Sequence, residues 1–219
     1  MAEAAAEQKT REQTGRDLHE LARSYLDRWD ELQVTLEEPN YNVRQDWLES
    51  SPVVVTKASF DGMTAEHVER FVADPPTNLD AINANMTVRR LPDQDGHMTV
   101  QYSVVTPMVV SDRTMFVTYY PMRDEANGKI TMVSGSAGNA HFEESETEAI
   151  ASQVVGKLEF TYLCFIARDG GYDVEMASCF NPEGWLPGFV QGLGVNAQTE
   201  ICREIVNYLM HGTVPATHW

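Results

Sequence analysis

The stretch FNPEGWLPGFVQGLGVNAQTEICREIVNYLM, residues 180–210, joins a turn to the longest helical pattern of the chain. Its second half carries an apolar residue at every fourth position, the spacing of one helix face: Ala197, Ile201, Ile205 and Leu209. Its first turns contain three glycines: Gly188, Gly192 and Gly194. Each interior glycine costs a helix about 1 kcal/mol relative to alanine. We predict a helix over 185–211 that is held firmly at its end and weakly at its start.

The segments before this helix alternate between polar and apolar residues, which is typical of half-buried strands. We predict strands at 42–49, 53–60, 85–91, 97–106, 113–121, 128–137, 154–168 and 171–180. Tight turns such as Asn127-Gly128 and Asp169-Gly170-Gly171 separate several of them and favour antiparallel hairpins.

Two more helices are predicted near the N-terminus. The first has a helical period from Asp17 to Leu36 and ends before Pro39. The second is short, with Thr64 as its N-cap and Pro75 at its end. Residues 1–15 are rich in Ala, Glu and Gln and are interpreted as a disordered tail. The pattern indicates one α+β domain, residues 16–219, with an antiparallel sheet.

Composition narrows the classes of function. Lys and Arg number 16 against 33 Asp and Glu, a net charge of −17, which argues against a nucleic-acid partner and against tight docking on anionic membranes. Cys164, Cys179 and Cys202 are widely spaced and match no metal motif or disulfide framework. With no signal segment and no apolar run of about 18 residues, we expect a cytoplasmic protein.

Two motifs resemble the StAR-related lipid-transfer (START) family. The first is QYSVVTPMVVSDRTMFVTYY, residues 101–120, in which Ser111, Asp112 and Arg113 stand where the family has Ser-Asn-Arg. Thr114 replaces an Asp of the family pattern. The second is GWLPG at the head of the last helix, residues 184–188. The resemblance covers roughly residues 20–211.

The resemblance implies a helix-grip (Bet v 1-like) fold, in which a curved sheet wraps around the C-terminal helix and leaves a tunnel for one lipid. The expected partner is a phospholipid, fatty-acyl or sterol-like molecule, held without a cofactor by a monomer that touches membranes transiently. The loop Thr106–Asp112 would form the gate, with three apolar residues at its tip: Met108, Val109 and Val110.

The predicted lipid-binding residues come from the strands, the gate loop and the last helix. They are Met98, Val100, Tyr102, Val104, Met108, Val109, Val110, Arg113, Tyr119, Phe160, Tyr162, Met176, Trp185, Phe189, Gly192, Leu193, Ala197 and Ile201. We predict no catalytic residues and no metal ligands.

Some positions depart from the family pattern. Sterol-binding members carry a buried acid–base pair, and the corresponding positions here are near Ser136 and Gly156, which are uncharged. This favours acyl chains or other apolar guests over sterols. A Trp-Asp pair of the family is reduced to Asp80.

Several alternatives remain open at this stage. A cyclase-type cavity enzyme would need inward polar groups, for which Tyr102, Tyr119, Tyr162 and Glu159 are candidates. A lipid-responsive sensor module is a third possibility. One of Arg89 and Arg90 could meet a lipid headgroup, because neighbouring strand residues face opposite sides. The acidic run around His141 is interpreted as a solvated loop.

Overall fold

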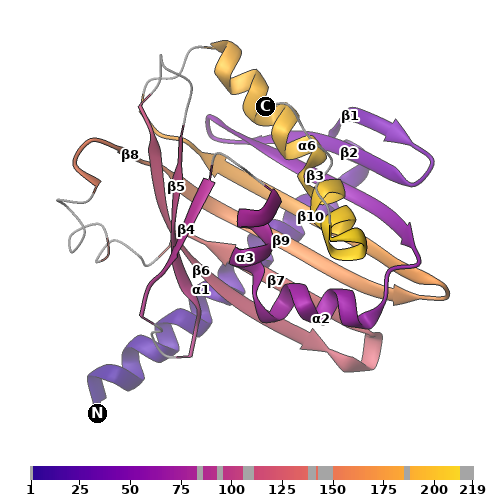
Figure 1. Ribbon diagram of the computed structural model, residues 1–219, viewed down its shortest axis with the longest axis horizontal. Helices are drawn as coiled ribbons and strands as arrows, with labels where there is room; N and C mark the ends of the chain where they lie inside the picture. The colour runs from indigo at the N-terminus through magenta and orange to yellow at the C-terminus, as the bar shows by residue number, and fades with distance from the viewer. Residues whose placement is uncertain are drawn as a thin grey trace.

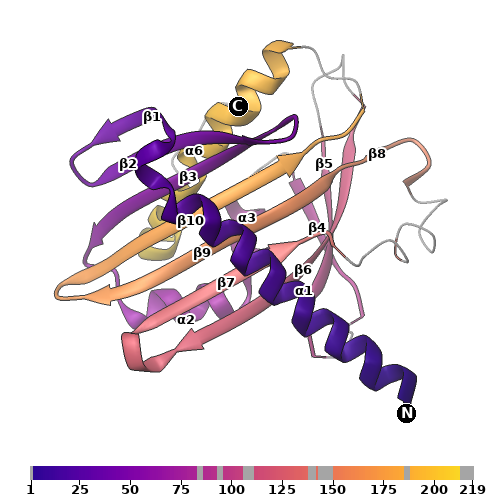
Figure 2. The ribbon, with the colours of Figure 1, turned by 180° about the vertical axis from the view of Figure 1, so that it is seen from behind.

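A single large antiparallel sheet dominates the structure, and helices cover both of its faces (Figures 1 and 2). The computed structural model describes residues 2–82, 86–92, 96–105, 111–137, 142, 150–184 and 188–212, and of these the side chains of 2–10, 80–82 and 188–197 are not described.

Most strands pair with their neighbours in sequence. The strands are β1 (Gln33–Glu38), β2 (Tyr41–Leu48), β3 (Ser51–Asp61), β4 (Met86–Arg90), β5 (Thr99–Val104), β6 (Arg113–Asp124), β7 (Lys129–Gly135), β8 (Val154–Val155), β9 (Lys157–Arg168) and β10 (Gly171–Asn181). Their order is β1-β2-β3-β10-β9-β7-β6-β5-β4, and the short β8 pairs with β6 in parallel. The predicted antiparallel sheet is confirmed.

The helices lie on two sides of this sheet. They are α1 (Ala2–Asp27), α2 (Ala65–Ala73), α3 (Pro75–Ile82) and α6 (Gly188–His211), with 3₁₀ turns η1 (Trp29–Glu31) and η2 (Glu125–Asn127). Helices α2, α3 and α6 lie on one side (Figure 1), and α1 crosses the other (Figure 2). We call these sides the α6 face and the α1 face.

Alternation along the strands gives each face its own apolar cluster. On the α6 face, Val54, Val117 and Leu163 pack with Ile205 and Leu209 of α6. On the α1 face, a second apolar cluster joins α1 to five of the strands, β3, β6, β7, β9 and β10; its members include Leu18, Ala22, Tyr25, Val55, Tyr120, Val133, Phe160 and Cys179. Because both faces are covered, central strands such as β9 and β10 are apolar on both sides.

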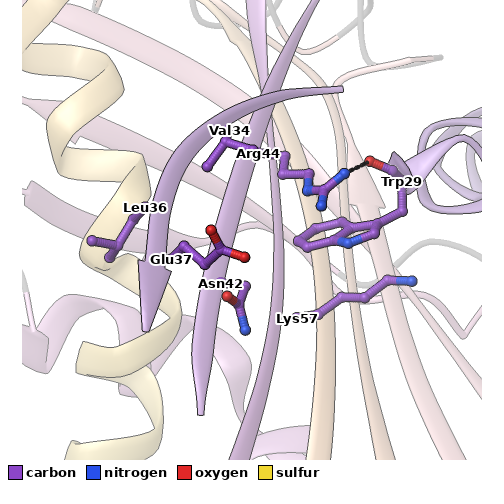
Figure 3. Close-up of a pocket in the computed structure, with 7 residues that line it drawn as sticks. All are labelled: Trp29, Val34, Leu36, Glu37, Asn42, Arg44 and Lys57. Carbon is purple, nitrogen blue, oxygen red and sulfur yellow. Dashed lines mark hydrogen bonds between the residues drawn. The ribbon is translucent and has the colours of Figure 1, made fainter. Parts of the chain in front are cut away.

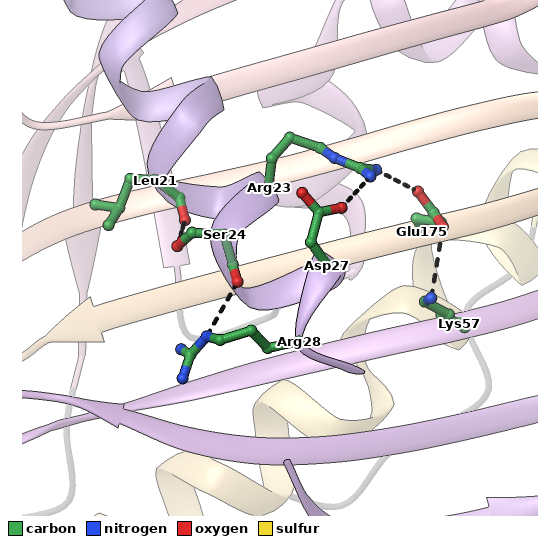
Figure 4. Close-up of polar contacts among 7 residues, drawn as sticks. All are labelled: Leu21, Arg23, Ser24, Asp27, Arg28, Lys57 and Glu175. Carbon is green, nitrogen blue, oxygen red and sulfur yellow. Dashed lines mark hydrogen bonds and ion pairs between the residues drawn. The ribbon is translucent and has the colours of Figure 1, made fainter. Parts of the chain in front are cut away.

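Polar contacts also attach α1 to the sheet (Figure 4). Arg23 Nη1 donates to Glu175 Oε2 of β10 at 3.0 Å, and Arg23 Nη2 lies 2.5 Å from Asp27 Oδ1. Lys57 Nζ of β3 approaches the same Glu175 at 3.9 Å. Such half-exposed pairs contribute little individually, so the apolar cluster supplies most of the attachment of α1.

Two N-terminal expectations need correction. The helix predicted as far as Leu36 ends at Asp27, and Gln33–Glu38 forms the edge strand β1. The β-branched Val34 and Thr35 favour a strand there, and Leu36 packs towards the α6 face. At the other end, α1 begins at Ala2, because the alanine-rich segment assigned to a tail has high helix propensity.

The predicted N-cap of the short helix is confirmed. Thr64 accepts a hydrogen bond from the His67 N–H at 3.5 Å, and His67 Nδ1 accepts one from the Thr64 N–H at 3.1 Å. These reciprocal bonds satisfy two backbone donors that a helix start leaves free. The sequence pattern predicts a loop or a single helical turn over residues 77–84, whereas a helix, α3, spans Pro75–Ile82.

Candidate functional site

The α6 face unites seven of the ten predicted lipid-binding residues whose side chains are described. Four of them are buried in its cluster: Val100, Tyr102, Tyr119 and Met176. Three others are partly buried against it: Met98, Val104 and Ile201. The cluster is closed by Val68 and Phe71 of α2 and by the second half of α6.

Two predicted residues lie on the opposite face. Phe160 stacks on Tyr25 of α1 with ring centroids 5.8 Å apart, and Tyr162 lies 5.5 Å from the ring of His19. Both therefore pack beneath α1 and cannot line a cavity under α6. The sequence pattern misassigned them because β9 is apolar on both faces, so that alternation gave no signal.

Arg113 has a different role from the one predicted. Its guanidinium donates to three backbone carbonyls: Nη1 to Ser111, Nε to Pro182 at 3.2 Å and Nη2 to Glu183 at 3.2 Å. The residue is 3% exposed, and burial lowers the pKa of its side chain. Arg113 thus ties the start of β6 to the connection between β10 and α6, and we remove it from the lipid-contacting set.

The remaining predicted residues lie wholly or partly outside the described part of the chain. Met108, Val109, Val110 and Trp185 lie outside the described residues. Phe189, Gly192, Leu193 and Ala197 belong to the described backbone of α6, but their side chains lie outside the description. The acidic run from His141 to Glu148 is likewise outside, apart from Phe142.

The other arginines considered for a headgroup have protein partners. Arg89 Nε donates to Gln101 Oε1 at 2.8 Å, and Gln101 also donates to Thr114 Oγ1 at 3.1 Å. Arg90 Nη2 lies 2.6 Å from Asp74 Oδ1, at the end of α2. These contacts account for both side chains without a ligand.

A tyrosine missed by the sequence reasoning anchors the middle of α6. The Tyr41 hydroxyl donates to the Thr199 carbonyl at 2.7 Å and accepts from the Arg203 N–H at 3.3 Å. An α-helix normally joins these two groups, four residues apart, directly. The Arg203 guanidinium carbon lies 4.1 Å from the Tyr41 ring centroid, and Arg203 pairs with Glu38 at 2.7 Å.

Three buried titratable groups of the α6 face, Tyr41, Tyr119 and Cys202, are uncharged at neutral pH. Burial raises the pKa of the Tyr41 and Tyr119 hydroxyls, and Tyr119 shares a hydrogen bond with Tyr102. Burial also raises the pKa of the Cys202 thiol to about 12. Protonated hydroxyls and thiols can form hydrogen bonds, but they are poor bases and nucleophiles at neutral pH.

Among the described residues, two of the three exposed large apolar side chains occur at one end of the sheet, where β10 leads towards α6, and the third, Val34, lines a groove on the α1 face. Trp47 is 53% exposed and Val105 is 60% exposed. Trp47 pairs with Pro52 at the start of β3, and Val105 follows Val104, which pairs with Arg113. Since Arg113 binds the carbonyls that follow β10, these residues share one end of the sheet, which we call the Gly184 end.

A groove of about 290 Å³ lies on the α1 face (Figure 3), and none of the residues that line it is a predicted lipid-binding residue. The indole of Trp29 lies between two cations, with Arg44 Cζ 4.7 Å and Lys57 Nζ 5.0 Å from its ring centroid. Its other lining residues are Val34, Leu36, Glu37 and Asn42. Mixed polarity and an open form make it an unsuitable site for an acyl chain.

An antiparallel sheet that holds a long C-terminal helix on one face defines a helix-grip fold. It is the fold of StAR-related lipid transfer domains, as the sequence motifs indicated. Human StAR-related lipid transfer protein 5 is similar with a TM-score of 0.75 at 12% identity, over 94% of this chain and 98% of that one.

Two further solved structures are similar. The lipid transfer and protein localization domain of human StarD13 (DLC2) has a TM-score of 0.59 at 14% identity, over 88% of this chain and 98% of its own. A STAR-related lipid transfer protein fragment from Xanthomonas axonopodis has a TM-score of 0.59 at 13% identity, covering 81% and 98%. No protein-family model and no curated protein sequence matches this chain.

The likeness in structure is thus much stronger than the likeness in sequence. At these identities it establishes the fold and does not carry a ligand with it. In the part of the chain that is described, none of the helices combines the length and hydropathy needed to span a bilayer.

Proposed function

We propose that this protein binds one hydrophobic lipid between the α6 face and helix α6 and carries it between membranes without catalysis. The observation that carries the proposal is the apolar cluster of the α6 face, which is closed on one side by a helix with a glycine-rich first half. The lipid-transfer names of the structurally similar proteins support the same assignment.

The energetics of burial suit such a role. Each methylene group moved from water to an apolar site contributes about 0.8 kcal/mol, so an acyl chain of about sixteen carbons gains about 12 kcal/mol before ordering costs. Such a site needs volume, an apolar lining and a few polar groups, and it needs no catalyst.

Membrane contact is proposed at the Gly184 end. Tryptophan favours the interface between water and lipid, and Trp47 and Val105 are both exposed there. Two exposed acidic residues lie at the same end: Glu49 is two residues after Trp47, and Asp112 precedes Arg113, the strand partner of Val104. With the chain at −17, the combination favours membranes of neutral lipids over anionic ones.

The proposal describes a monomer with one domain that works in the cytoplasm and exchanges its lipid during brief encounters with membranes. Catalysis has less support, since Tyr102 and Tyr119 bond to each other and Tyr162 lies on the α1 face.

Native mass spectrometry and organic extraction of the purified protein test the proposal. We expect one equivalent of an apolar lipid, either co-purified or taken up from vesicles. A protein that is empty and takes up no lipid would refute it. Transfer between vesicles of varied anionic content tests the membrane preference, and faster transfer to anionic than to neutral acceptors would contradict it.

A further inference from the structure

A row of hydroxyl groups crosses the α6 face. Tyr119 of β6 is directly opposite Ser134 of β7, Ser134 is opposite Thr161 of β9, and Thr161 is opposite Ser178 of β10. Directly opposed residues of adjacent strands point to the same side of a sheet. Because Tyr119 belongs to the α6-face cluster, all four side chains face α6.

The neighbouring row is apolar. Two residues further from the Gly184 end, Met132, Leu163 and Met176 occupy the corresponding positions of β7, β9 and β10. All three belong to the α6-face cluster. The hydroxyl row therefore crosses an otherwise apolar face, with Leu158 and Phe180 of the same cluster on its Gly184 side. The polar part of a guest whose chain lay over Met132, Leu163 and Met176 would meet this row.

The hydrogen bonds within the row leave capacity for a further partner. Ser134 is 4% exposed, yet within the described residues its hydroxyl has no hydrogen-bond partner. A hydroxyl can donate one hydrogen bond and accept others, so Ser134 keeps its full capacity for a guest. Thr161 Oγ1 and Ser178 Oγ are 3.3 Å apart, longer than the usual 2.5–3.0 Å between hydroxyl oxygens, so their mutual bond is weak.

We infer that this row is the polar subsite of the lipid site, and that it selects an uncharged lipid with several hydroxyl or carbonyl oxygens. The inference rests on the lipid carriage proposed above and narrows its ligand class. Three steps between strands of about 4.8 Å separate Tyr119 from Ser178, or about 14 Å. A glycerol ester or a similar neutral head can reach more than one member of the row.

The charge of nearby groups supports an uncharged head. Hydroxyls can satisfy neutral oxygens, whereas a buried phosphate or carboxylate requires a cation or several donors. The described cations next to this face are engaged elsewhere: Arg113 with three carbonyls, Arg90 with Asp74 and Arg70 with the carbonyl of Leu209.

A competition experiment tests the inference with three probes of equal chain length. The full-length protein is equilibrated with 1-monooleoylglycerol, 1-oleoyl-lysophosphatidic acid and 1-octadecene, and the bound lipids are extracted and quantified. We expect monooleoylglycerol to be preferred over each of the others. Ser134→Ala and Ser178→Ala should each reduce its preference over 1-octadecene by about two- to tenfold, the loss of one hydrogen bond.

Thr131→Val is the matched control, because Thr131 is a buried hydroxyl residue of the same strand β7 that faces α1. It should leave the preference unchanged. Thr161→Val, at a partly exposed position, replaces either serine variant if circular dichroism reveals misfolding. The comparison among probes on the unaltered protein does not depend on any variant.

The outcomes separate the two proposals. Equal binding of monooleoylglycerol and 1-octadecene, or serine variants that behave like Thr131→Val, would overturn the hydroxyl subsite and leave lipid carriage standing. A preference for lysophosphatidic acid would overturn the uncharged class. If the protein binds none of the three probes, lipid carriage itself is contradicted, and the hydroxyl subsite is refuted with it.

Discussion

Replacing Tyr41 by phenylalanine removes one hydroxyl and tests whether that hydroxyl anchors α6. The hydroxyl bonds to the Thr199 carbonyl at 2.7 Å and to the Arg203 N–H at 3.3 Å, and Tyr41 is 4% exposed. Each hydrogen bond contributes about 0.5–1.5 kcal/mol net. Phenylalanine keeps the ring beneath Arg203, so packing and stacking are retained.

The expected loss is about 1–2 kcal/mol in the free energy of unfolding. The lower value applies if Arg203 and Thr199 bond directly, as in an ordinary helix, and the higher value applies if they do not. For a chain of this size, 1 kcal/mol lowers Tm by about 2–4 °C, so Tm should fall by about 2–8 °C. Urea denaturation followed by circular dichroism measures the loss, and hydrogen exchange of the Arg203 amide locates it.

Tyr172→Phe is the matched control. Tyr172 belongs to the same cluster and is 9% exposed, and its hydroxyl has no hydrogen bond within the described part of the chain. Its replacement should change stability by less than about 0.5 kcal/mol. If the two variants behave alike, or if exchange at Arg203 is unaltered in Tyr41→Phe, the anchoring role of the hydroxyl is refuted.

Four other expectations can be checked separately. Arg113→Met should lower the free energy of unfolding by about 2–4 kcal/mol in urea, because it leaves three carbonyls without their donor; a loss below about 1 kcal/mol would contradict the buried geometry. Burial and Arg23 lower the pKa of His19 from its ordinary 6.5, so the unfolded chain binds a proton more readily than the folded one. The free energy of unfolding should therefore fall as the pH drops below 6.5, and His19→Gln should flatten that part of its pH profile. Trp47→Ala should weaken sedimentation with neutral vesicles about tenfold at unchanged Tm, whereas equally weakened binding in Val34→Ala, in the groove on the α1 face, would refute a local role. Gly192→Leu should abolish lipid uptake in a protein that still folds, and a protein that instead unfolds would mean that the glycine serves close helix packing.

The sequence predicted the positions of most strands along the chain well, because hairpin turns and alternation are local signals. Each β stretch from residue 41 onwards was recognised, and the Thr64 cap followed from its side chain. The edge strand β1 was missed because the apolar residues of 29–36 also fit a helical period. Only pairing with β2, which is a tertiary contact, resolves that ambiguity.

The site was predicted less completely than the fold. Residues on strands that alternate apolar with polar positions, such as Val100 and Tyr102, were assigned to the α6 face correctly. Phe160 and Tyr162 were not, because a strand buried on both faces gives no alternation. The role of Arg113 could not be read from sequence, since its three carbonyl partners include two about 70 residues away. Tyr41 and the hydroxyl row depend in the same way on strand register.

The independent cluster beneath α1 has a consequence for a protein that must release its cargo. A lipid carrier has to remain folded after its lipid has left. In this fold the sheet is also supported on the α1 face, where Leu18, Ala22 and Tyr25 of α1 pack against the strands. These contacts do not depend on a guest on the α6 face. Release of the guest would therefore remove contacts from the α6 face of the sheet only. The empty form would remain folded and able to bind another lipid.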